Sequence, residues 1–468
     1  MASTFGLLNS AYSGLAAARA ALEVTGQNVA NVNTPGYTRQ RVDLASLPGV
    51  DKSSLFTTGL NIGTGVQITG ISRISDSLID ARVRDTASSS GYWTAASTAL
   101  SVVENGLGEP GDTGLSASLT QFSNAWQTMA NTAGNSTTGP AAASALLGSA
   151  QALADRIASG YSTASKAWST ARSSAEASVD QVNRTGVQIA ALNDQILRIA
   201  ATGGNANELI DQRGAAINAL SAATGATTRE NANGTVDVLI GGSTFVSGTS
   251  ARTLQLTGAA AAPFTATGLR FSDGAAVQAD GGSLAAQLST LAPEGVYSQA
   301  ANAYSAVATQ LATDVNAVHR QGAIADGTTG HDFFALDASK PAAIGLSVVP
   351  TSQSGIAAGK PGAGSGDGSI ADAISQLGSK AGGVDRGWAA YVAGVGAQTK
   401  AATTQADVAA TASSAAQSAQ TSQSGVDLDE ETANLVVFQH AYQGAARVLT
   451  AIDEMLDTLI NRTGLVGR

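Results

Sequence analysis

Hydrophobic residues near the N-terminal end of the chain recur every seven positions. One series is Leu8, Leu15, Leu22 and Val29, and a second follows three residues later at Ala11, Ala18, Thr25 and Val32. This is the spacing of a and d positions in a helix that packs against another helix. Gly14 and Gly26 interrupt the repeat, and each lowers the stability of a helix by about 1 kcal/mol. We therefore expect this helix to need a partner.

The C-terminal end carries a longer repeat of the same kind. Its a positions are Leu428, Leu435, Tyr442, Leu449 and Leu456, and its d positions are Glu431, Phe438, Ala445, Ile452 and Leu459. Acidic residues follow Asp427 at once, which suits the start of a helix. Either repeat alone would indicate an ordinary amphipathic helix within its own domain. Two such repeats at opposite ends of the chain favour pairing of the two helices, parallel or antiparallel, with each other and with neighbouring copies.

The pattern changes several times between these ends. Alternating hydrophobic residues with Asn-Gly, Gly-Gly and Asp-Gly turns predict hairpins within residues 226–291. The other expected elements are strand and loop at 38–75, helices at 76–105, 141–222, 296–319 and 370–424, and a glycine-rich loop at 355–369. The order is helix, mixed, helix, β-rich, helix. It predicts that a β-rich domain is inserted into a helical rod.

The predicted fold class is therefore mainly α with an inserted β-rich domain. We expect an elongated multidomain protein with paired N- and C-terminal coiled-coil helices and a helical rod domain. The predicted domains are a terminal helical (inner core) domain of residues 1–36 and 426–468, a helical rod domain with some β structure of residues 37–222 and 376–425, and a β-rich outer domain of residues 223–375 with one helix near 296–319.

Composition narrows the function. The chain has a net charge of −10 and only 13% charged residues, whereas an ordinary globular protein has about 25%. An acidic chain is a poor binder of phosphate backbones, so we expect no nucleic acid partner. No apolar run is long enough to span a membrane, and the N-terminus does not read as a cleavable secretory signal. The low charge favours a surface that is covered by copies of the chain.

Candidate catalytic and metal-binding motifs are poor. Of the three histidines, His319, His331 and His440, none pairs at the spacing of two metal ligands on a helix. The Gly-x-Gly-x-x-Gly match at 106–111 follows a helix rather than a strand, so we interpret it as a loop that ends that helix. We predict no enzyme, no cofactor and no metal. The rival hypothesis is a secreted hydrolase with the β-rich insert as its catalytic domain, which would require a pocket with converging Asp, Glu or His side chains.

Both ends of the chain resemble a known protein family. Residues 15–40 (LAAARAALEVTGQNVANVNTPGYTRQ) and residues 425–461, which begin GVDLDEE and end IDEMLDTLIN, are similar to the terminal motifs of bacterial flagellar rod, hook and hook-associated axial proteins. The motif residues are Asn28, Asn31, Asn33, Pro35, Gly36 and Tyr37. We expect the asparagines to cap or turn the chain. Pro35 and Gly36 should then end the helix, with a strand beginning near Tyr37.

Interior segments resemble the hook–filament junction branch of that family. These segments are residues 182–196, 207–221, 315–322 and 331–334, together with Thr38-Arg39-Gln40. The resemblance implies a structural subunit that joins hook to filament by polymerising through its terminal helices. The alternative within the family is a hook or distal rod subunit, which would lack long paired helices in residues 140–222.

The resemblance also implies partners and a location. The partners would be the chain itself in a ring or helical oligomer, hook protein, the next hook-associated protein, and a dedicated export chaperone at the C-terminal region. The location would be the extracellular flagellum, reached through the flagellar type III apparatus without a cleavable signal. The predicted assembly-interface residues are Leu8, Leu15, Leu22, Val29, Leu428, Leu435, Phe438, Tyr442, Leu449, Ile452, Leu456 and Leu459.

Overall fold

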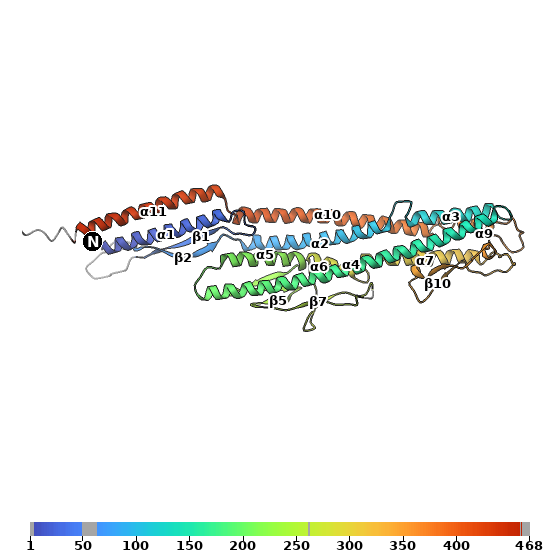
Figure 1. The fold of residues 1–468 in the computed structure, drawn as a ribbon, viewed down its shortest axis with the longest axis horizontal. Coiled ribbons are helices and arrows are strands. Elements are labelled where there is room, and N and C mark those ends of the chain that lie inside the picture. Colours follow the sequence, from blue (N-terminus) through green and yellow to red (C-terminus); the bar gives the residue numbers. More distant parts are fainter. Residues whose placement is uncertain (1–3, 49–62, 261–262, 459, 461–468) are drawn as a thin grey trace, which may run out of the picture.

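A computed structural model describes residues 4–48, 63–260, 263–458 and 460. The molecule is a long, narrow bundle of helices (Figure 1). Its helices are α1 (Thr4–Ala30), α2 (Ser77–Leu107), α3 (Leu115–Asn131), α4 (Gly139–Ala201), α5 (Asn207–Thr224), α6 (Gly282–Leu291), α7 (Val296–His319), α8 (Ala342–Gly345), α9 (Ser369–Ser375), α10 (Val384–Ser424) and α11 (Leu428–Asp457), with a 3₁₀ turn at Gln353–Gly355. The mainly helical fold class with small sheets is confirmed.

The strands form four small antiparallel sheets in the described part of the chain. They are β1 (Gln40–Leu47) with β2 (Gly65–Arg73); β3 (Thr227–Glu230), β4 (Val236–Ile240), β5 (Ser243–Ser247) and β6 (Ser250–Ala251); β7 (Leu254–Leu256), β8 (Leu269–Phe271) and β9 (Ala276–Val277); and β10 (Phe334–Leu336) with β11 (Leu346–Val348). Each sheet joins strands that are consecutive along the chain. The hairpins predicted within 226–291 are confirmed at β3–β9.

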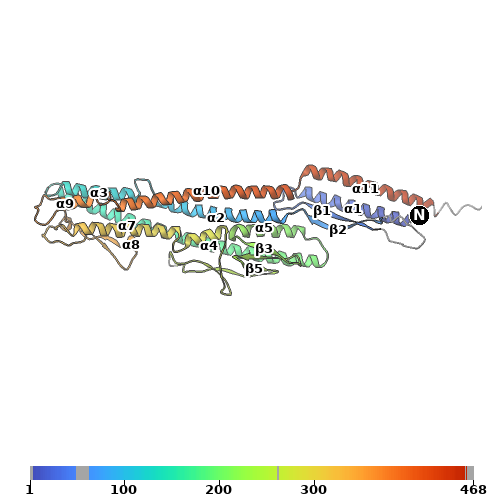
Figure 2. The same cartoon turned by 180° about the vertical axis from the view of Figure 1, so that it is seen from behind.

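The two terminal helices lie side by side at one end of the molecule. Helix α1 ends where α11 begins, so the two run antiparallel (Figures 1 and 2). The orientation left open by the sequence is thus antiparallel. Asp427 caps α11, because its side chain accepts hydrogen bonds from the backbone N–H groups of Asp429 and Glu430. The hairpin β1–β2 packs against α1, and the Ser13 hydroxyl accepts a hydrogen bond of 3.2 Å from the N–H of Val66.

The rod continues from this end. Helices α2 and α10 run side by side along it, and Gln420 on α10 donates a 2.6 Å hydrogen bond to Asp80 at the start of α2. Helix α4 has 63 residues, which makes it about 95 Å long at 1.5 Å per residue. It passes the β-rich outgrowth and reaches the far end of the molecule, where it packs with α3 and α7 (Figure 2).

The outgrowth of β3–β9 leaves the rod at the end of α5 and returns at the start of α6. The chain turns there at Gly225, which has a left-handed φ of +70°. A Cβ atom on Gly225 would lie 2.7 Å from the backbone nitrogen of Gly281. The departing and returning segments therefore touch each other through two glycines, and we call this contact the glycine neck.

Most predicted helices are confirmed, with two adjustments. Helix α7 has the predicted bounds, and Gly108 ends α2 in the left-handed conformation expected of a helix-terminating loop. Helix α3 was not predicted, although its buried residues follow a helical period at Leu115, Leu119, Phe122, Trp126 and Met129. The expected helices at 141–222 and 370–424 are each divided, the first into α4 and α5 by residues 202–206 and the second into α9 and α10 by a turn at residues 376–383.

Candidate assembly site at the terminal helices

The seam between α1 and α11 is built from small side chains on the α1 side. The most buried residues of α1 are Ala11, Ala17, Ala18, Ala21, Val24, Thr25 and Asn28. On α11 the most buried residues are Glu431 and Ile452. Alanine on one helix lets the other approach closely, which explains how the seam forms without a layer of leucines. The large a-position residues of α1 flank this seam and are half-buried.

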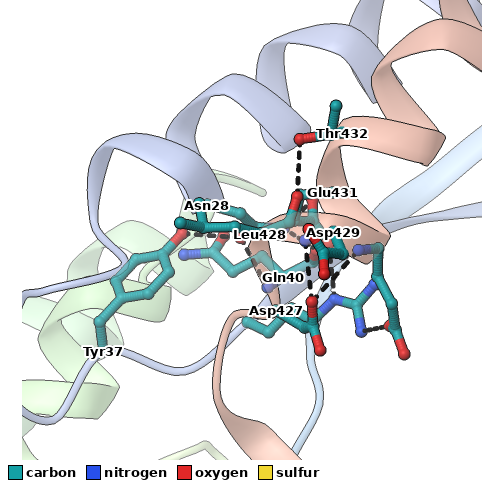
Figure 3. A network of polar contacts seen from close by, with 10 residues as sticks. Asn28, Tyr37, Gln40, Asp427, Leu428, Asp429, Glu431 and Thr432 are labelled. Atoms are coloured by element: carbon teal, nitrogen blue, oxygen red, sulfur yellow. Dashed lines mark hydrogen bonds and ion pairs between the residues drawn. The ribbon is translucent and has the colours of Figure 1, made fainter.

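Asn28 is the centre of a polar network at the end of the seam (Figure 3). Its Oδ1 accepts hydrogen bonds from Tyr37 Oη and from the backbone N–H of Gln40, both 3.0 Å long. Its Nδ2 donates to the carbonyl oxygen of Gln40 at 2.9 Å and to Glu431 Oε2 at 3.1 Å. Asn28 and Glu431 are each only 1% exposed. One buried amide thus joins α1, the start of β1 and α11.

Arg39 connects the same network to the first turn of α11. Its Nε lies 2.7 Å from Glu431 Oε1, and its Nη1 lies 2.5 Å from Glu430 Oε2. Its backbone N–H donates a 2.9 Å hydrogen bond to the carbonyl oxygen of Ser424. Burial lowers the pKa of the Arg39 guanidinium, but the Glu430 hydrogen bond and the Glu431 charge outweigh burial and raise the pKa overall. The two carboxylates therefore have a permanently charged partner.

A second group of polar contacts fastens this end to the rod. Asp211 on α5 accepts a 2.9 Å hydrogen bond from the N–H of Thr38, and its other oxygen lies 2.7 Å from Arg73 Nε. Asn207 donates 3.0 Å hydrogen bonds to the Gln40 side chain and to the carbonyl oxygen of Ile71. Burial raises the pKa of Asp211, and Arg73 partly offsets this effect. Burial and nearby carboxylates raise the pKa of Tyr37 to about 12, so its hydroxyl keeps its proton at neutral pH.

The large apolar core does not extend into this joint. The main cluster of buried hydrophobic side chains runs from Ala99 to Val395. Among the described residues, it contains none from α1, β1, β2 or α11. The terminal helices are therefore attached to the rod mainly through hydrogen bonds and ion pairs.

The predicted interface residues occupy two environments. Leu428, Leu435 and Tyr442, all a positions of α11, remain 47%, 38% and 38% exposed. Half-buried or buried positions are Leu8, Leu15, Leu22, Val29, Phe438, Leu449, Ile452 and Leu456. Leu459 lies outside the described residues. Their assignment to contacts between subunits stays a prediction.

The family-motif residues behave differently from one another. Asn28 was expected to cap or turn the chain, but it lies inside α1 and bonds to other segments, because a neighbouring strand and helix supply its partners. Asn31 does bond back to its own helix, through Nδ2 to the carbonyl oxygen of Gln27 at 3.0 Å. Asn33, Pro35 and Gly36 are exposed in the turn after α1, and Gly36 has a φ of +79° that favours glycine. Sequence reasoning missed Arg39 and Asn207 as partners, since their contacts join distant segments.

The histidines do not form a metal site. His319 is fully buried, with Nδ1 at 2.8 Å from the carbonyl oxygen of His331 and Nε2 accepting from the N–H of Ala357 at 2.9 Å. His440 is exposed on α11. No group of three or more His, Asp or Glu residues could hold a metal ion within the residues described. Over the same residues, no helix is both long and apolar enough to cross a membrane.

Comparison with known proteins extends these observations. Residues 100–334 match the family "Flagellar hook-associated protein FlgK helical domain", residues 8–38 match "Flagella basal body rod protein", and residues 417–462 match "Flagellar basal body rod FlgEFG protein C-terminal". Flagellar hook-associated protein 1 of Bacillus subtilis (strain 168) is 32% identical over 512 residues, covering 100% of each chain. The chain belongs to the flagellar hook-associated protein 1 family.

Other members of the hook-associated protein 1 family agree. The Salmonella typhimurium (strain LT2) protein is 32% identical over 340 residues, which are 70% of this chain and 59% of that relative. The solved flagellar hook junction protein FlgK from Burkholderia pseudomallei has a TM-score of 0.61 at 16% identity and covers 73% of this chain and 99% of its own. That likeness shows the shared fold. As a hook-associated protein 1 family member, the chain is a structural, extracellular subunit of the flagellum and not an enzyme, and it assembles with other flagellar subunits.

Proposed function

We propose that this chain joins the flagellar hook to the filament and polymerises through α1 and α11. The observation that carries the proposal is the row of large apolar side chains left uncovered on α11, at Leu428, Leu435 and Tyr442. These residues are seven apart, so they lie along one side of the helix. In a single subunit they flank the seam to α1. A neighbouring terminal helix of a second copy would cover them.

The predicted division into domains fits this role. Residues 1–36 and 426–468 would form the inner core of a tube, residues 37–222 and 376–425 the rod outside it, and residues 223–375 the outer part, of which α6 and α7 pack against the rod helix α4. The partners would be further copies of this chain, hook protein on one side and the next hook-associated protein on the other. A dedicated export chaperone would bind the C-terminal region before assembly, and the export route would be the flagellar type III apparatus. The names of the relatives support the flagellar partners, and the uncovered row on α11 supports contacts between copies of the chain.

The proposal can be tested by placing charges on the uncovered row. Leu428→Asp together with Leu435→Asp should abolish filament attachment, because each carboxylate would be buried without a partner in the assembled seam. Both leucines are already partly exposed in the subunit, so the purified variant should melt within a few degrees of the parent chain. Cells would shed filament protein into the medium, which immunoblotting detects.

The matched control adds the same charge elsewhere on α11. Ala433 and His440 are exposed, are seven positions apart, and lie on the side of the helix turned away from the uncovered row. Ala433→Asp with His440→Asp should leave filaments attached. Normal filaments with the leucine variant, or an equal defect with the control, would show that subunits do not meet through this row.

A further inference from the structure

The buried polar network at the end of the seam contains a charged residue, Glu431, that helix pairing alone does not require. Glu431 occupies a d position, where the seven-residue repeat calls for an apolar side chain, and it is 1% exposed. Burying a charged pair is a weak source of stability, and apolar replacements are often neutral or stabilising. Buried polar groups at such positions are better attested as determinants of helix register and partner. The charge on Glu431 therefore calls for an explanation other than stability.

The apolar seam alone fixes the register poorly. On α1 the residues at successive heptad positions are Ala11, Ala18 and Thr25, all small. Sliding α11 by one heptad brings side chains of nearly the same size opposite one another again. A slide of one heptad keeps most of the apolar overlap between the helices, so hydrophobic burial opposes the slipped arrangement only weakly. The apolar seam by itself therefore distinguishes poorly between neighbouring registers.

The polar network, in contrast, disfavours the slipped arrangement of the two helices. In the observed register Glu431 meets Asn28 Nδ2 at 3.1 Å and Arg39 Nε at 2.7 Å. Because the helices are antiparallel, sliding α11 by one heptad toward the start of α1 brings Glu431 next to Ala21, whose side chain offers no hydrogen-bond donor. The carboxylate would then be buried without a partner, which is strongly unfavourable. Arg39 follows α1 in the chain and cannot move with α11, since its N–H is bonded to Ser424 O.

We propose that Asn28, Arg39 and Glu431 form a register lock that makes the C-terminal helix pair with its own N-terminal helix in a single alignment. The inference rests on the proposed function, because the uncovered row on α11 reaches a neighbouring subunit at a fixed height only if that alignment is unique. The specificity-determining residue is Glu431. Leu428, Leu435 and Tyr442 would supply the contact, and the register lock would set where along the axis it occurs.

Glu431→Leu removes the lock cleanly. In this variant Arg39 retains its 2.5 Å ion pair with Glu430. Asn28 retains both hydrogen bonds to the Gln40 backbone and the hydrogen bond from the Tyr37 hydroxyl. The leucine restores an apolar d position, so the helices should stay paired. Glu430→Leu is the matched control, since Glu430 is largely exposed and Arg39 keeps Glu431. Glu431→Gln is the conservative variant, because its amide still needs buried polar partners.

The experiment measures the distance between spin labels in the purified full-length chain. The sequence has no cysteine, so labels can be attached at Tyr12→Cys on α1 and Ala433→Cys on α11. Both positions are exposed, and they are offset along the helix axis. One heptad is about 10 Å of helix, so a slipped pair gives a second distance that differs by nearly that amount.

The parent chain, Glu430→Leu and Glu431→Gln should each give one distance, whereas Glu431→Leu should add a second. A single parental distance in Glu431→Leu, several distances in the parent chain, or loss of helix in Glu431→Leu by circular dichroism would each overturn the register lock. None of these results depends on filament attachment. Failure of the proposed function would instead appear as normal filaments with the Leu428 and Leu435 variant.

Discussion

Asn193 holds the β-rich outgrowth on the rod from a fully buried position on α4. Its Nδ2 donates to the carbonyl oxygens of Val236 and Gly248 at 2.8 and 2.7 Å. Its Oδ1 accepts from the N–H of Val236 at 3.1 Å and from Arg213 Nη1 at 2.9 Å. Every polar atom of the side chain is thus paired, and the amide acts as an additional piece of backbone beside β4.

Asn193→Leu should therefore destabilise the protein strongly. The leucine would leave the Val236 N–H and C=O and the Gly248 C=O without partners in the interior, at about 1–3 kcal/mol for each group. We expect a loss of several kcal/mol in the free energy of unfolding, measured by urea titration. Gln188→Leu on the exposed side of the same helix should change it by no more than about 0.5 kcal/mol. Equal effects of the two substitutions would contradict this role for Asn193.

His319 makes the far end of the molecule sensitive to acid. Burial lowers its pKa below the usual value near 6.5, although the hydrogen bond to His331 O and the charge of Asp332 act in the opposite direction and His331 adds to the lowering. The neutral ring is required, because Nε2 accepts a hydrogen bond from Ala357. The unfolded chain therefore takes up a proton more readily than the folded chain as the pH falls.

The stability contributed by His319 is complete above pH 6.5 and is lost as the pH falls from there toward the lowered pKa. The slope for one proton is at most about 1.4 kcal/mol per pH unit. Urea titrations between pH 7.5 and 5 should show this loss in the parent chain and a flatter profile in His319→Gln. Parallel profiles would mean that another group titrates in this range.

At the scale of elements, the joint between the terminal helices and the rod should melt by itself. The apolar core ends before the joint, and Arg39 carries the ion pairs to both Glu430 and Glu431. Arg39→Ala leaves Glu431 buried without a cation, which should destabilise the terminal pair by about 3–5 kcal/mol.

Circular dichroism at 222 nm should then show two melting steps, with Arg39→Ala shifting only the lower one. Arg41→Ala serves as the control, because Arg41 is exposed and lies 3.3 Å from Asp43 on the same strand, where an ion pair contributes little. A single melting step, lowered as a whole by Arg39→Ala, would show that joint and rod unfold together.

The elements themselves were largely predictable from the sequence, and the reasons differ. The seven-residue repeats gave α1 and α11 because a buried stripe requires that period. Dipeptides that favour left-handed turns indicated the hairpins of β3–β9. Helix α3 was missed although its apolar period was present. Of the two series predicted for α1, the structure buries Ala11, Ala18 and Thr25 and leaves the leucines half-buried beside them, since small side chains allow closer packing than larger ones.

At the scale of the whole molecule, the sequence predicted the elongated shape and the pairing of the two ends. It did not predict the polar joint. Asn28 and Glu431 are 403 positions apart, and Asn207 and Gln40 are 167 apart. Periodicity and local propensity report neighbours within a few turns, so a contact across such separations leaves no local pattern. The candidate site was therefore predicted as a pair of apolar helices, without the charges that join them.

The glycine neck has a consequence for how this molecule can vary. Gly225 and Gly281 are in contact. The whole outgrowth is therefore attached to the rod as a loop whose two ends meet at one point. Insertions or deletions beyond that point alter what protrudes from the surface without changing the spacing of α5 and α6. The outgrowth is thus an exchangeable cassette, limited only by the need to cover the side of α4 that carries Asn193. A lineage could remodel its exterior there while the axial contacts stayed the same.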